Sequence, residues 1–502
     1  MFNLVKNELT KIFSKKSIYI VLLVFLILAV FVLVVEKYGE KISAMASVKD
    51  ITYLEEELKN IDISTESGKM QYWSLKSEVE IRELVNQYGG YSTWQGEKIF
   101  EDIWPIKIDM NLYQNGLDEF ATNTSYSKEQ IQKEYDKIME RIKTGDWKSF
   151  VQEDLKEQEE QIKLMEEQMQ NTTNDVSSKE LNKSLEILKL EAQVNNWRLE
   201  KEIPYRDQEY DSALIRYSTL GNILLDYNYT HNIDKTNYKE KVSDQFDYNE
   251  KMAYQEYLAE FEISKYRIEN EIPSLESVSS SIENLIPNIG LLFILVISVM
   301  ITGTIVSEEF NKGTIKVLLI RPYTRRKIML SKIIASVIAV VISMFGLLLI
   351  QIVVSGIGFG FSTINMPVLK YNFNANSVIE MNVFVWFIVN VLAVSPIIII
   401  ISAIALTIGT VITNSTCAIG FSMIIYMTSG ILKQMLLVFG NKTKWIKFIP
   451  FVNWDLTECL YGKLHSIQGV TMQNSILTCT ILAALLLFMT FKNFSDKNIK
   501  NI

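Results

Sequence analysis

Long apolar runs without a single charged residue constrain this chain more than any other feature. Five such runs stand out, at 18–35, 286–306, 333–369, 381–432 and 470–491. One transmembrane helix takes about 20 residues, so each run is long enough to cross a bilayer and the 52-residue run 381–432 must hold two spans. The polar turn formers at 413–415 mark the break between those two. The sequence therefore predicts an all-α polytopic membrane protein with six transmembrane helices.

Charge is divided unevenly along the chain. Residues 36–283 carry 30 Lys and Arg against 51 Asp and Glu, a net charge of −21, whereas the rest of the chain has a net charge of +13. No run between 36 and 284 is apolar enough to cross a membrane. This block is predicted to be a water-exposed acidic domain inserted between the first two spans, and its charge argues against binding to nucleic acid.

These patterns predict six spans, at 17–35, 286–306, 333–361, 383–413, 416–438 and 470–491. The cytoplasmic segments are an amphipathic elbow helix at 1–16, a connector at 307–332 and a tail at 492–502. The extracytoplasmic segments are an acidic domain at 36–285, with a helical hairpin at 150–202, and an outer loop at 439–469 that partly re-enters the membrane or lies on its outer surface. A cleaved signal peptide is the alternative for the N-terminus. The 18-residue run after it is longer than a typical signal core of about 7–15 residues, which favours a retained span.

The orientation follows from the basic residues in the short segments. With six spans the N-terminus, the connector and the tail fall on one face, and together they hold fourteen Lys and Arg. The loop 440–469 on the opposite face holds four, which is weaker evidence for the reverse orientation. The positive-inside rule makes the first face cytosolic, so both termini are predicted to be cytoplasmic and residues 36–285 extracytoplasmic.

Within the acidic block two segments have apolar residues in a strict four-three alternation, 151–169 and 181–199. This is the heptad pattern of packed helices, and the turn formers NTTNDVSS between them predict an antiparallel coiled-coil hairpin. Gln158 and Asn195 lie on the seam and would set its register. The hairpin is either part of the helical core of the domain or a projecting clamp that contacts a substrate or accessory protein.

Other parts of the block are less regular. The segments 53–60 and 238–271 are predicted to be helical, and 86–126, rich in Gly, Trp and Tyr, to be a compact subdomain with a few strands whose aromatic side chains form a core. No residue pattern in the sequence indicates a catalytic site or a metal site. His231 has no second His or Cys nearby for a metal site, Cys417, Cys459 and Cys479 form no disulfide framework, and the carboxylates read as a solvated helix surface. We expect no enzyme activity and no cofactor in this chain.

The connector 307–332, SEEFNKGTIKVLLIRPYTRRKIMLSK, is basic and lies between two spans. Gly313 is predicted to end a helix that leaves span 2, and Arg321–Pro322 to break the chain again before span 3. Between them TIKVLLI, residues 314–320, would form a short interfacial helix with charged ends. A membrane anchor does not need such a segment, whereas a part that docks into a groove of a cytosolic partner does.

Three parts of the chain resemble ABC-2 type transporter permeases of the bacitracin-resistance and sodium-export kind, and with the spans the resemblance covers about half of the chain. NELTKIFSKKSIYI resembles the elbow helix and first span of that family, and FIPFVNWDLTECLYG its last outer loop. The connector resembles the family signature through Glu309, Gly313, Thr314, Leu318, Leu319, Arg321, Pro322, Arg325 and Lys332. The large insertion between spans 1 and 2 departs from the smaller family members, and some relatives with large domains there are phage-infection or virulence-secretion membrane proteins.

The resemblance implies the membrane-spanning permease half of an ABC exporter. It implies a homodimer or heterodimer with a second permease, and a separate cytosolic ATPase that holds ATP and Mg, since no G-x-x-x-x-G-K-[ST] phosphate loop occurs in this chain. The connector would receive the ATP-driven movement through the following predicted coupling contacts: Glu308, Glu309, Gly313, Thr314, Arg321, Pro322, Arg325 and Arg326. The exported substrate would be a peptide, an antimicrobial or a lipid-like compound. The alternative is a surface receptor or scaffold whose outer domain binds a peptide, wall polymer or phage.

Overall fold

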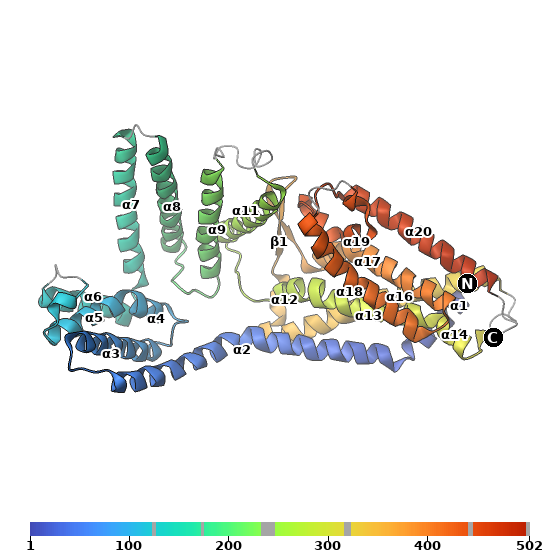
Figure 1. Ribbon diagram of the computed structural model, residues 1–502, viewed down its shortest axis with the longest axis horizontal. Helices are drawn as coiled ribbons and strands as arrows, with labels where there is room; N and C mark the ends of the chain where they lie inside the picture. Colours follow the sequence, from blue (N-terminus) through green and yellow to red (C-terminus); the bar gives the residue numbers. More distant parts are fainter. Residues whose placement is uncertain (123–126, 172–174, 232–245, 316–322, 440–444, 498–502) are drawn as a thin grey trace. The chain divides into compact units, whose positions relative to one another are not determined.

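The computed structural model describes residues 1–122, 127–171, 175–231, 246–315, 323–439 and 445–497 (Figure 1). The chain forms two compact units. The span unit comprises residues 1–33, 239–259 and 276–502, and the insertion unit comprises residues 34–238 and 260–275.

Six helical segments within the described residues are long and apolar enough to cross a membrane. They are Lys16–Gly39, Val278–Asn311, Arg325–Phe359, Val383–Val411, Ser415–Leu437 and Met472–Asp496. In a bilayer every backbone polar group must be paired within the protein, and a helix meets that requirement within one segment. The chain is therefore an all-α polytopic membrane protein, as its apolar runs predicted. The break predicted at 413–415 lies between helices α17 (Val383–Val411) and α18 (Ser415–Phe439).

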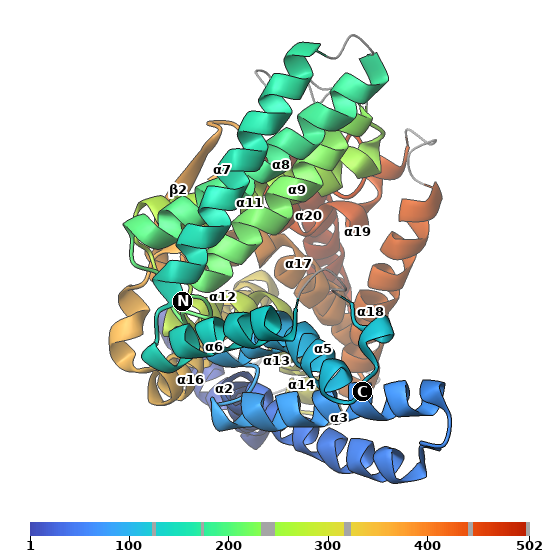
Figure 2. The same ribbon diagram turned by 90° about the vertical axis from the view of Figure 1, so that its left-hand side faces the viewer.

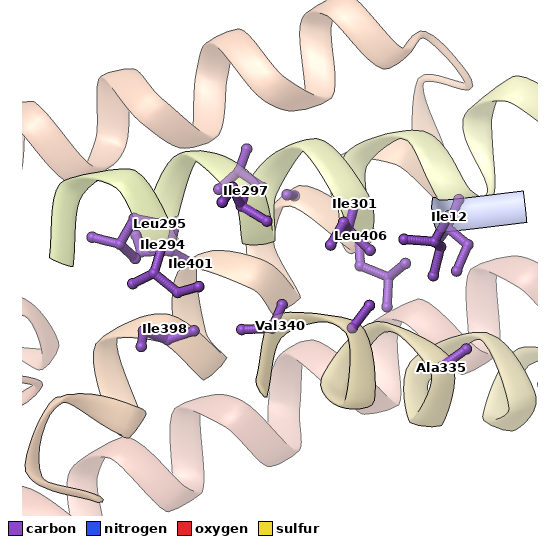
Figure 3. Packing of buried hydrophobic residues seen from close by; sticks show 14 of the residues in the cluster. Ile12, Ile294, Leu295, Ile297, Ile301, Ala335, Val340, Ile398, Ile401 and Leu406 are labelled. Carbon is purple, nitrogen blue, oxygen red and sulfur yellow. The ribbon is translucent and has the colours of Figure 1, made fainter. Parts of the chain in front are cut away.

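The core of the span unit is built around helix α13 (Leu291–Ile305), which packs against α17 and α16 (Arg325–Phe359). Figure 3 shows Ile297 and Leu295 of α13 among isoleucines of α17 and Val340 of α16. Glycine allows the closest approach, because a Cβ added at Gly409 of α17 would lie only 3.1 Å from the carbonyl oxygen of Gly303. The last span, α20 (Met472–Asp496), packs beside α17.

Span 2 begins earlier than the sequence indicated. Helix α12 (Val278–Leu285) leads through a π-helical turn, η4 (Ile286–Gly290), into α13. Ser277 and Ser280 close a reciprocal capping box that starts α12, and Pro287 lies in the π-turn. The apolar run 286–306 was thus only the inner part of a longer helical segment.

Span 3 also begins earlier than predicted. Thr324 caps α16 by accepting a hydrogen bond from the Lys327 backbone nitrogen at 3.4 Å, and the helix starts at Arg325. The predicted connector 307–332 therefore ends as regular helix, because Arg and Lys are good helix formers and no breaker follows Pro322. Span 1 is likewise part of a longer helix, α2 (Lys16–Asn60). The predicted interfacial helix 314–320 lies outside the described residues from 316 onward.

A short antiparallel β-hairpin follows α16. Strand β1 (Val368–Asn372) pairs with β2 (Ser377–Met381), with Lys370 opposite Ile379. Sequence reasoning assigned no structure to these residues. The loop between α18 and α20 contains the 3₁₀ segments Ile446–Phe448 and Leu456–Gly462 and the helical turn α19 (Pro450–Asn453). The fully buried Asn453 accepts a hydrogen bond from Ser475 of α20 at 2.9 Å, so this loop is anchored to the last span.

The insertion unit is helical, and the prediction of strands in 86–126 is wrong for the described part, residues 86–122. That part contains α4 (Trp94–Lys98), a π-turn η1 (Ile99–Ile103), α5 (Trp104–Gln114) and the 3₁₀ turn η2 (Asp118–Phe120). Gly89 and Gly90, both at positive φ, make a tight turn that ends the preceding helix α3 (Glu66–Gln87). The aromatic residues form a core with α6 (Lys128–Thr144), as predicted.

The predicted coiled-coil hairpin is present as α7 (Trp147–Asn171) and α8 (Asp175–Glu200), which lie side by side in Figures 1 and 2. Gln158 and Asn195 meet on the seam, where the Asn195 amide donates to Gln158 Oε1 at 3.0 Å. Helix α8 also packs against α9 (Asp211–Thr230) through Trp197 and Tyr217, and Tyr217 in turn stacks on Phe261 of α11 (Tyr248–Glu269). The end of the hairpin near Trp197 is thus part of the helical core.

Candidate functional site

The candidate site is an ion cluster where the N-terminal helix α1 (Phe2–Phe13) meets the start of the connector and the start of α16. Helix α1 is amphipathic, and its buried side consists of Leu4, Val5, Glu8 and Ile12. Glu8 is therefore a carboxylate in an otherwise apolar stripe, with only 4% of its surface exposed. Such a burial requires charged or hydrogen-bonding partners.

Lys332 of α16 is the partner at the centre of the cluster. Its side chain is fully buried, and its ammonium lies 2.9 Å from Glu8 Oε2, 2.8 Å from Glu309 Oε1 and 3.1 Å from the carbonyl oxygen of Ile305. An ammonium has three N–H donors, so these three acceptors satisfy it. A single lysine thus connects α1, the end of α13, and α14 (Ser307–Asn311), which begins the connector.

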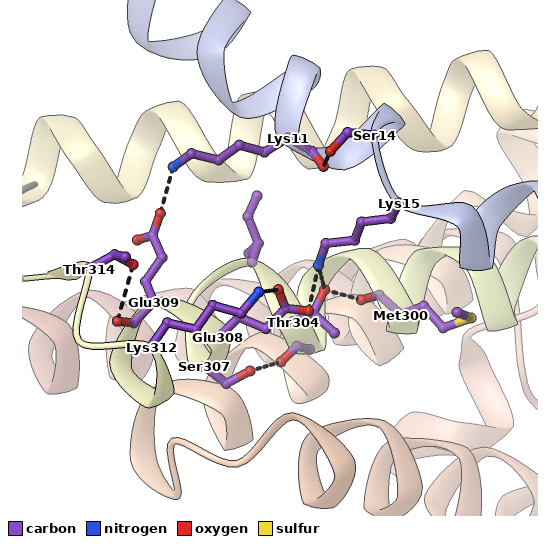
Figure 4. Close-up of polar contacts among 12 residues, drawn as sticks. Lys11, Ser14, Lys15, Met300, Thr304, Ser307, Glu308, Glu309, Lys312 and Thr314 are labelled. Carbon is purple, nitrogen blue, oxygen red and sulfur yellow. Dashed lines mark hydrogen bonds and ion pairs between the residues drawn. The ribbon is translucent and has the colours of Figure 1, made fainter.

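Two further lysines join the N-terminal segment to the connector (Figure 4). Lys11 lies 3.0 Å from Glu8 Oε1 and 2.8 Å from Glu309 Oε1. Lys15 lies 2.7 Å from Glu308 Oε1 and donates to the Thr304 hydroxyl at 2.7 Å. Burial lowers the pKa of the Lys11 ammonium, but its hydrogen bonds and charge attraction to Glu309 and Glu8 outweigh burial and raise that pKa above its ordinary value.

Removing any one charged side chain of the cluster is expected to destabilise the fold. Removing one partner of a buried ion pair typically costs about 3–5 kcal/mol, since the remaining charge stays buried without compensation. Glu309 is 8% exposed and Glu8 4%, so without Lys332 these two buried carboxylates would share only the half-exposed Lys11 among the described residues. A displacement of α14 is therefore resisted unless Lys332 and Glu8 follow it. The cluster is a mechanical connection between the connector and two other helices.

The remaining predicted site residues are placed as follows. Gly313, with φ of +68°, lies just after the end of α14, and the Thr314 hydroxyl donates to the Glu309 carbonyl oxygen at 3.4 Å. Arg321 and Pro322 lie outside the described residues. Arg325 is not in the ion cluster but donates to the carbonyl oxygens of Ser495 and Lys497 at 2.7 and 3.0 Å, at the end of α20.

The structure thus brings Glu308 and Glu309 into the cluster but not Arg325, and Arg326 is exposed. Sequence reasoning assigned no coupling role to Glu8, Lys11, Lys15 or Lys332, although it included Lys332 in the family signature. A signal for Glu8 was available: it is one acidic residue on the apolar side of an amphipathic helix, three residues before Lys11. Its partner 324 residues away could not be read from such a pattern.

The fold and the cluster define a six-span membrane protein whose connector is held by ion pairs to its N-terminal helix and third span. A family model described as "Protein of unknown function (DUF2705)" matches residues 252–500. The uncharacterized protein YhcI of Bacillus subtilis (strain 168) is 30% identical over 247 residues, which are 48% of this chain and 75% of YhcI. The chain belongs to the family of YhcI.

A second relative is the uncharacterized membrane protein YdbK of the same organism, 28% identical over 180 residues, which are 36% of this chain and 67% of YdbK. No solved structure matches the chain. The family model covers most of α11 and the chain from α12 to α20, and of the insertion unit it includes only residues 260–275.

Proposed function

We propose that this chain is the membrane-spanning permease subunit of an ABC exporter, driven by a separate cytosolic ATPase subunit that carries ATP and Mg. The observation that carries the proposal is the buried contact of Lys332 with Glu8 and Glu309. A membrane anchor gains nothing from tying a short connector to two other helices. A subunit that must convert a push on its connector into movement of its spans requires such a connection.

The contacts indicate which helices would move together with the connector. A partner that docks on the connector would move α14, and Glu309 at its buried face would take Lys332 of α16 with it. Glu8 and Lys11 would bring α1 along, because both contact the same group of charges. The connector, span 3 and the N-terminal helix would respond as one body, and the remaining spans would move relative to it.

The proposal includes the topology. The N-terminal helix, the connector and the end of α20 lie at one end of the span unit, where Arg325 contacts the last residues of α20 and the Lys497 ammonium donates to the Thr410 carbonyl oxygen at the end of α17. The excess of Lys and Arg in these segments supports a cytosolic location for that end. The acidic insertion 36–285 would then be extracytoplasmic, and the cargo a peptide, an antimicrobial or a lipid-like compound.

The test is recovery of the ATPase. The tagged full-length chain is purified from its native membranes in a mild detergent, and the co-purified proteins are identified by mass spectrometry. We expect an ABC ATPase in stoichiometric amount, together with ATP hydrolysis by the complex. Repeated recovery of intact chain without any ABC ATPase would contradict the proposal.

A charge reversal sharpens the test. Arg321→Glu in the connector is expected to abolish ATP hydrolysis by the complex and leave membrane insertion intact, because Arg321 is a predicted docking contact. Lys327→Glu makes the same charge change at an exposed position six residues on, outside the predicted coupling contacts, and serves as the matched control. If the two variants have equal activity, Arg321 is not a docking contact. Deleting residues 150–202 separates a receptor from a pump, since a pump keeps basal ATP hydrolysis without the hairpin.

A further inference from the structure

A cavity of about 100 Å³ lies beside the ion cluster, between α1, the first turn of α2 and the end of α13 with α14. One part of its lining is charged or polar and consists of two lysines, Lys11 and Lys15, the hydroxyls of Ser17 and Thr304, and three carboxylates, Glu8, Glu308 and Glu309. The other part is apolar and includes Ile18 and Ile301. A cavity with one polar and one apolar part fits a molecule of the same two-sided character.

The polar part can bind an anion. Within the described residues each of the two lysine ammoniums has two acceptors, Glu8 and Glu309 for Lys11 and Glu308 and Thr304 for Lys15. An ammonium carries three N–H donors, so one donor remains on each. Helix α2 begins at Lys16, and Ser17 and Ile18 of its first turn line the cavity. The unpaired N–H groups of a helix N-terminus add to the attraction for an anion.

The same part also offers an acceptor. Glu309 lines the cavity and is 8% exposed, and its Oε2 has no hydrogen-bond partner among the described residues, whereas its Oε1 receives both Lys11 and Lys332. A buried carboxylate oxygen without a donor is costly. A ligand that carries both an anionic group and a hydrogen-bond donor would use all of these groups together.

The position of the cavity selects the source of such a ligand. It lies at the start of the first candidate span, Lys16–Gly39, and at the end of the second, Val278–Asn311. The ends of membrane-spanning helices lie at the level of the lipid headgroups. Beyond the cavity, α2 exposes Ile20, Leu23 and Ile27, which gives a lipid chain an apolar surface to lie on.

We infer that this cavity binds the headgroup of a membrane phospholipid, with its phosphodiester on Lys11, Lys15 and the N-terminus of α2 and its terminal glycerol or ethanolamine donor on Glu309. The acyl chains would extend past Ile18 and Ile301 along the exposed side of α2. The inference requires only that the chain spans a membrane. It does not depend on an ATPase partner, so it stands or falls separately from the proposed function.

The test uses the full-length protein, freed of co-purified lipid, in a non-ionic detergent. Short-chain dihexanoylphosphatidylglycerol is titrated, and bound lipid is counted by native mass spectrometry alongside the melting temperature. We expect saturable binding of one lipid per chain. Dihexanoylglycerol, which lacks the phosphate, and inorganic phosphate, which lacks the acyl chains and the glycerol headgroup, are expected to bind far more weakly. Equal binding of dihexanoylglycerol, or equal binding of inorganic phosphate, would overturn the inference.

Variants connect the binding to the cavity. Lys15→Gln removes one anion contact at a partly exposed position and is expected to weaken binding roughly tenfold, the effect of losing one charge-assisted hydrogen bond. Thr304→Val keeps the side-chain shape and is not expected to weaken binding, because it leaves the Lys15 charge in place and frees one more of its N–H donors. Lys6→Gln removes the same charge from an exposed position of α1 outside the cavity lining. If Lys6→Gln weakens binding as much as Lys15→Gln does, the lipid is held by general surface charge and the assigned site is wrong.

Discussion

Lys332 in the span unit and Arg198 in the insertion unit are both buried cations held by carboxylates, but they join very different stretches of chain. Lys332 contacts Glu8, 324 residues away in the sequence, whereas Arg198 contacts Asp211, 13 residues away. Arg198 also donates to the Pro204 carbonyl oxygen at 3.1 Å, so it closes the loop between α8 and α9. The cluster around Lys332 joins three separate helices, whereas the pair of Arg198 with Asp211 orders only the loop between α8 and α9.

The comparison shows that similar charge chemistry can serve a local or a long-range purpose. A buried pair within one loop orders that loop and costs little chain entropy to form. A buried pair between distant helices makes those helices move together. The two groups of ion pairs should therefore respond differently when they are broken.

The largest expected effect is that of Lys332→Met. The substitution leaves the buried carboxylates of Glu8 and Glu309 with the half-exposed Lys11 as their one remaining cation among the described residues, and we expect a loss of about 3–5 kcal/mol, enough to deplete folded protein in the membrane. The measurement is the yield and melting temperature of the detergent-solubilised chain by fluorescence-detected size exclusion. A melting temperature equal to that of the unmodified chain would show that the cluster carries no stability.

A triple variant separates charge burial from packing. Glu8→Gln, Glu309→Gln and Lys332→Met together leave no buried charge on these three side chains, and replacing a whole buried ion group is often neutral. We expect the triple variant to regain most of the melting temperature but, under the proposed exporter function, to lose coupled ATP hydrolysis, since the helices are no longer held by ion pairs. If it melts as low as Lys332→Met, unpaired charge is not the cause of the loss.

A smaller effect is expected for Arg198→Met, because Asp211 retains the Arg206 backbone N–H at 3.0 Å. We expect a loss of about 3 kcal/mol confined to the insertion unit, the upper range for a hydrogen bond to a charged group. Limited proteolysis should then cut within 201–210 while the spans stay intact. The control is Arg216→Met, which removes an exposed pair with Glu260 and should change little.

The hairpin seam should give an effect of about 1 kcal/mol. Asn195→Leu leaves the Gln158 amide without its partner, and the loss of one such hydrogen bond typically costs that amount. Changing both residues to Leu should restore or raise the melting temperature of the hairpin, because the seam becomes fully apolar. Two equally destabilised variants would show that this hydrogen bond contributes nothing to the packing.

The smallest effect is a pH dependence at His465 in the loop before α20. Burial lowers the pKa of its imidazole below the ordinary 6.5, and the Glu458 carboxylate 3.3 Å away opposes that shift only in part. Among the described residues, the charge of Lys433 lowers this pKa further, and the Tyr248 hydroxyl donates to the His465 backbone carbonyl oxygen at 2.6 Å. The unfolded chain therefore binds the proton more readily than the folded chain.

The contribution of neutral His465 to the stability of the fold is fully present above pH 6.5, and it is lost as the pH falls through the folded-state pKa of the imidazole. Burial raises the pKa of Glu458, but Lys433 and His465 outweigh burial and keep it below the ordinary 4.5, so Glu458 stays ionised in this range. We expect the melting temperature to fall between pH 7 and pH 5. His465→Asn keeps an acceptor for the Ile467 N–H and should flatten this part of the profile. An unchanged slope would assign the pH dependence to another group.

The sequence alone determined the features that depend on one continuous segment. The number of spans followed from apolar length, because the thickness of the bilayer sets how many residues a helix needs. The hairpin followed from the heptad pattern, and the end of α14 near Gly313 from a glycine that can take positive φ. The start of α16 at Arg325 was missed, because charged residues were taken as the end of a span although they are good helix formers.

Only the tertiary structure decided which charges meet. Glu8, Glu309 and Lys332 each lie in a segment that reads correctly as helix, but nothing in any one segment says which of the many carboxylates pairs with the buried lysine. The choice is made when α1, α14 and α16 pack, because the low-dielectric interior makes an unpaired charge costly and leaves only complementary arrangements stable. The sequence therefore fixes which segments cross the membrane, and packing fixes the ion cluster that connects them.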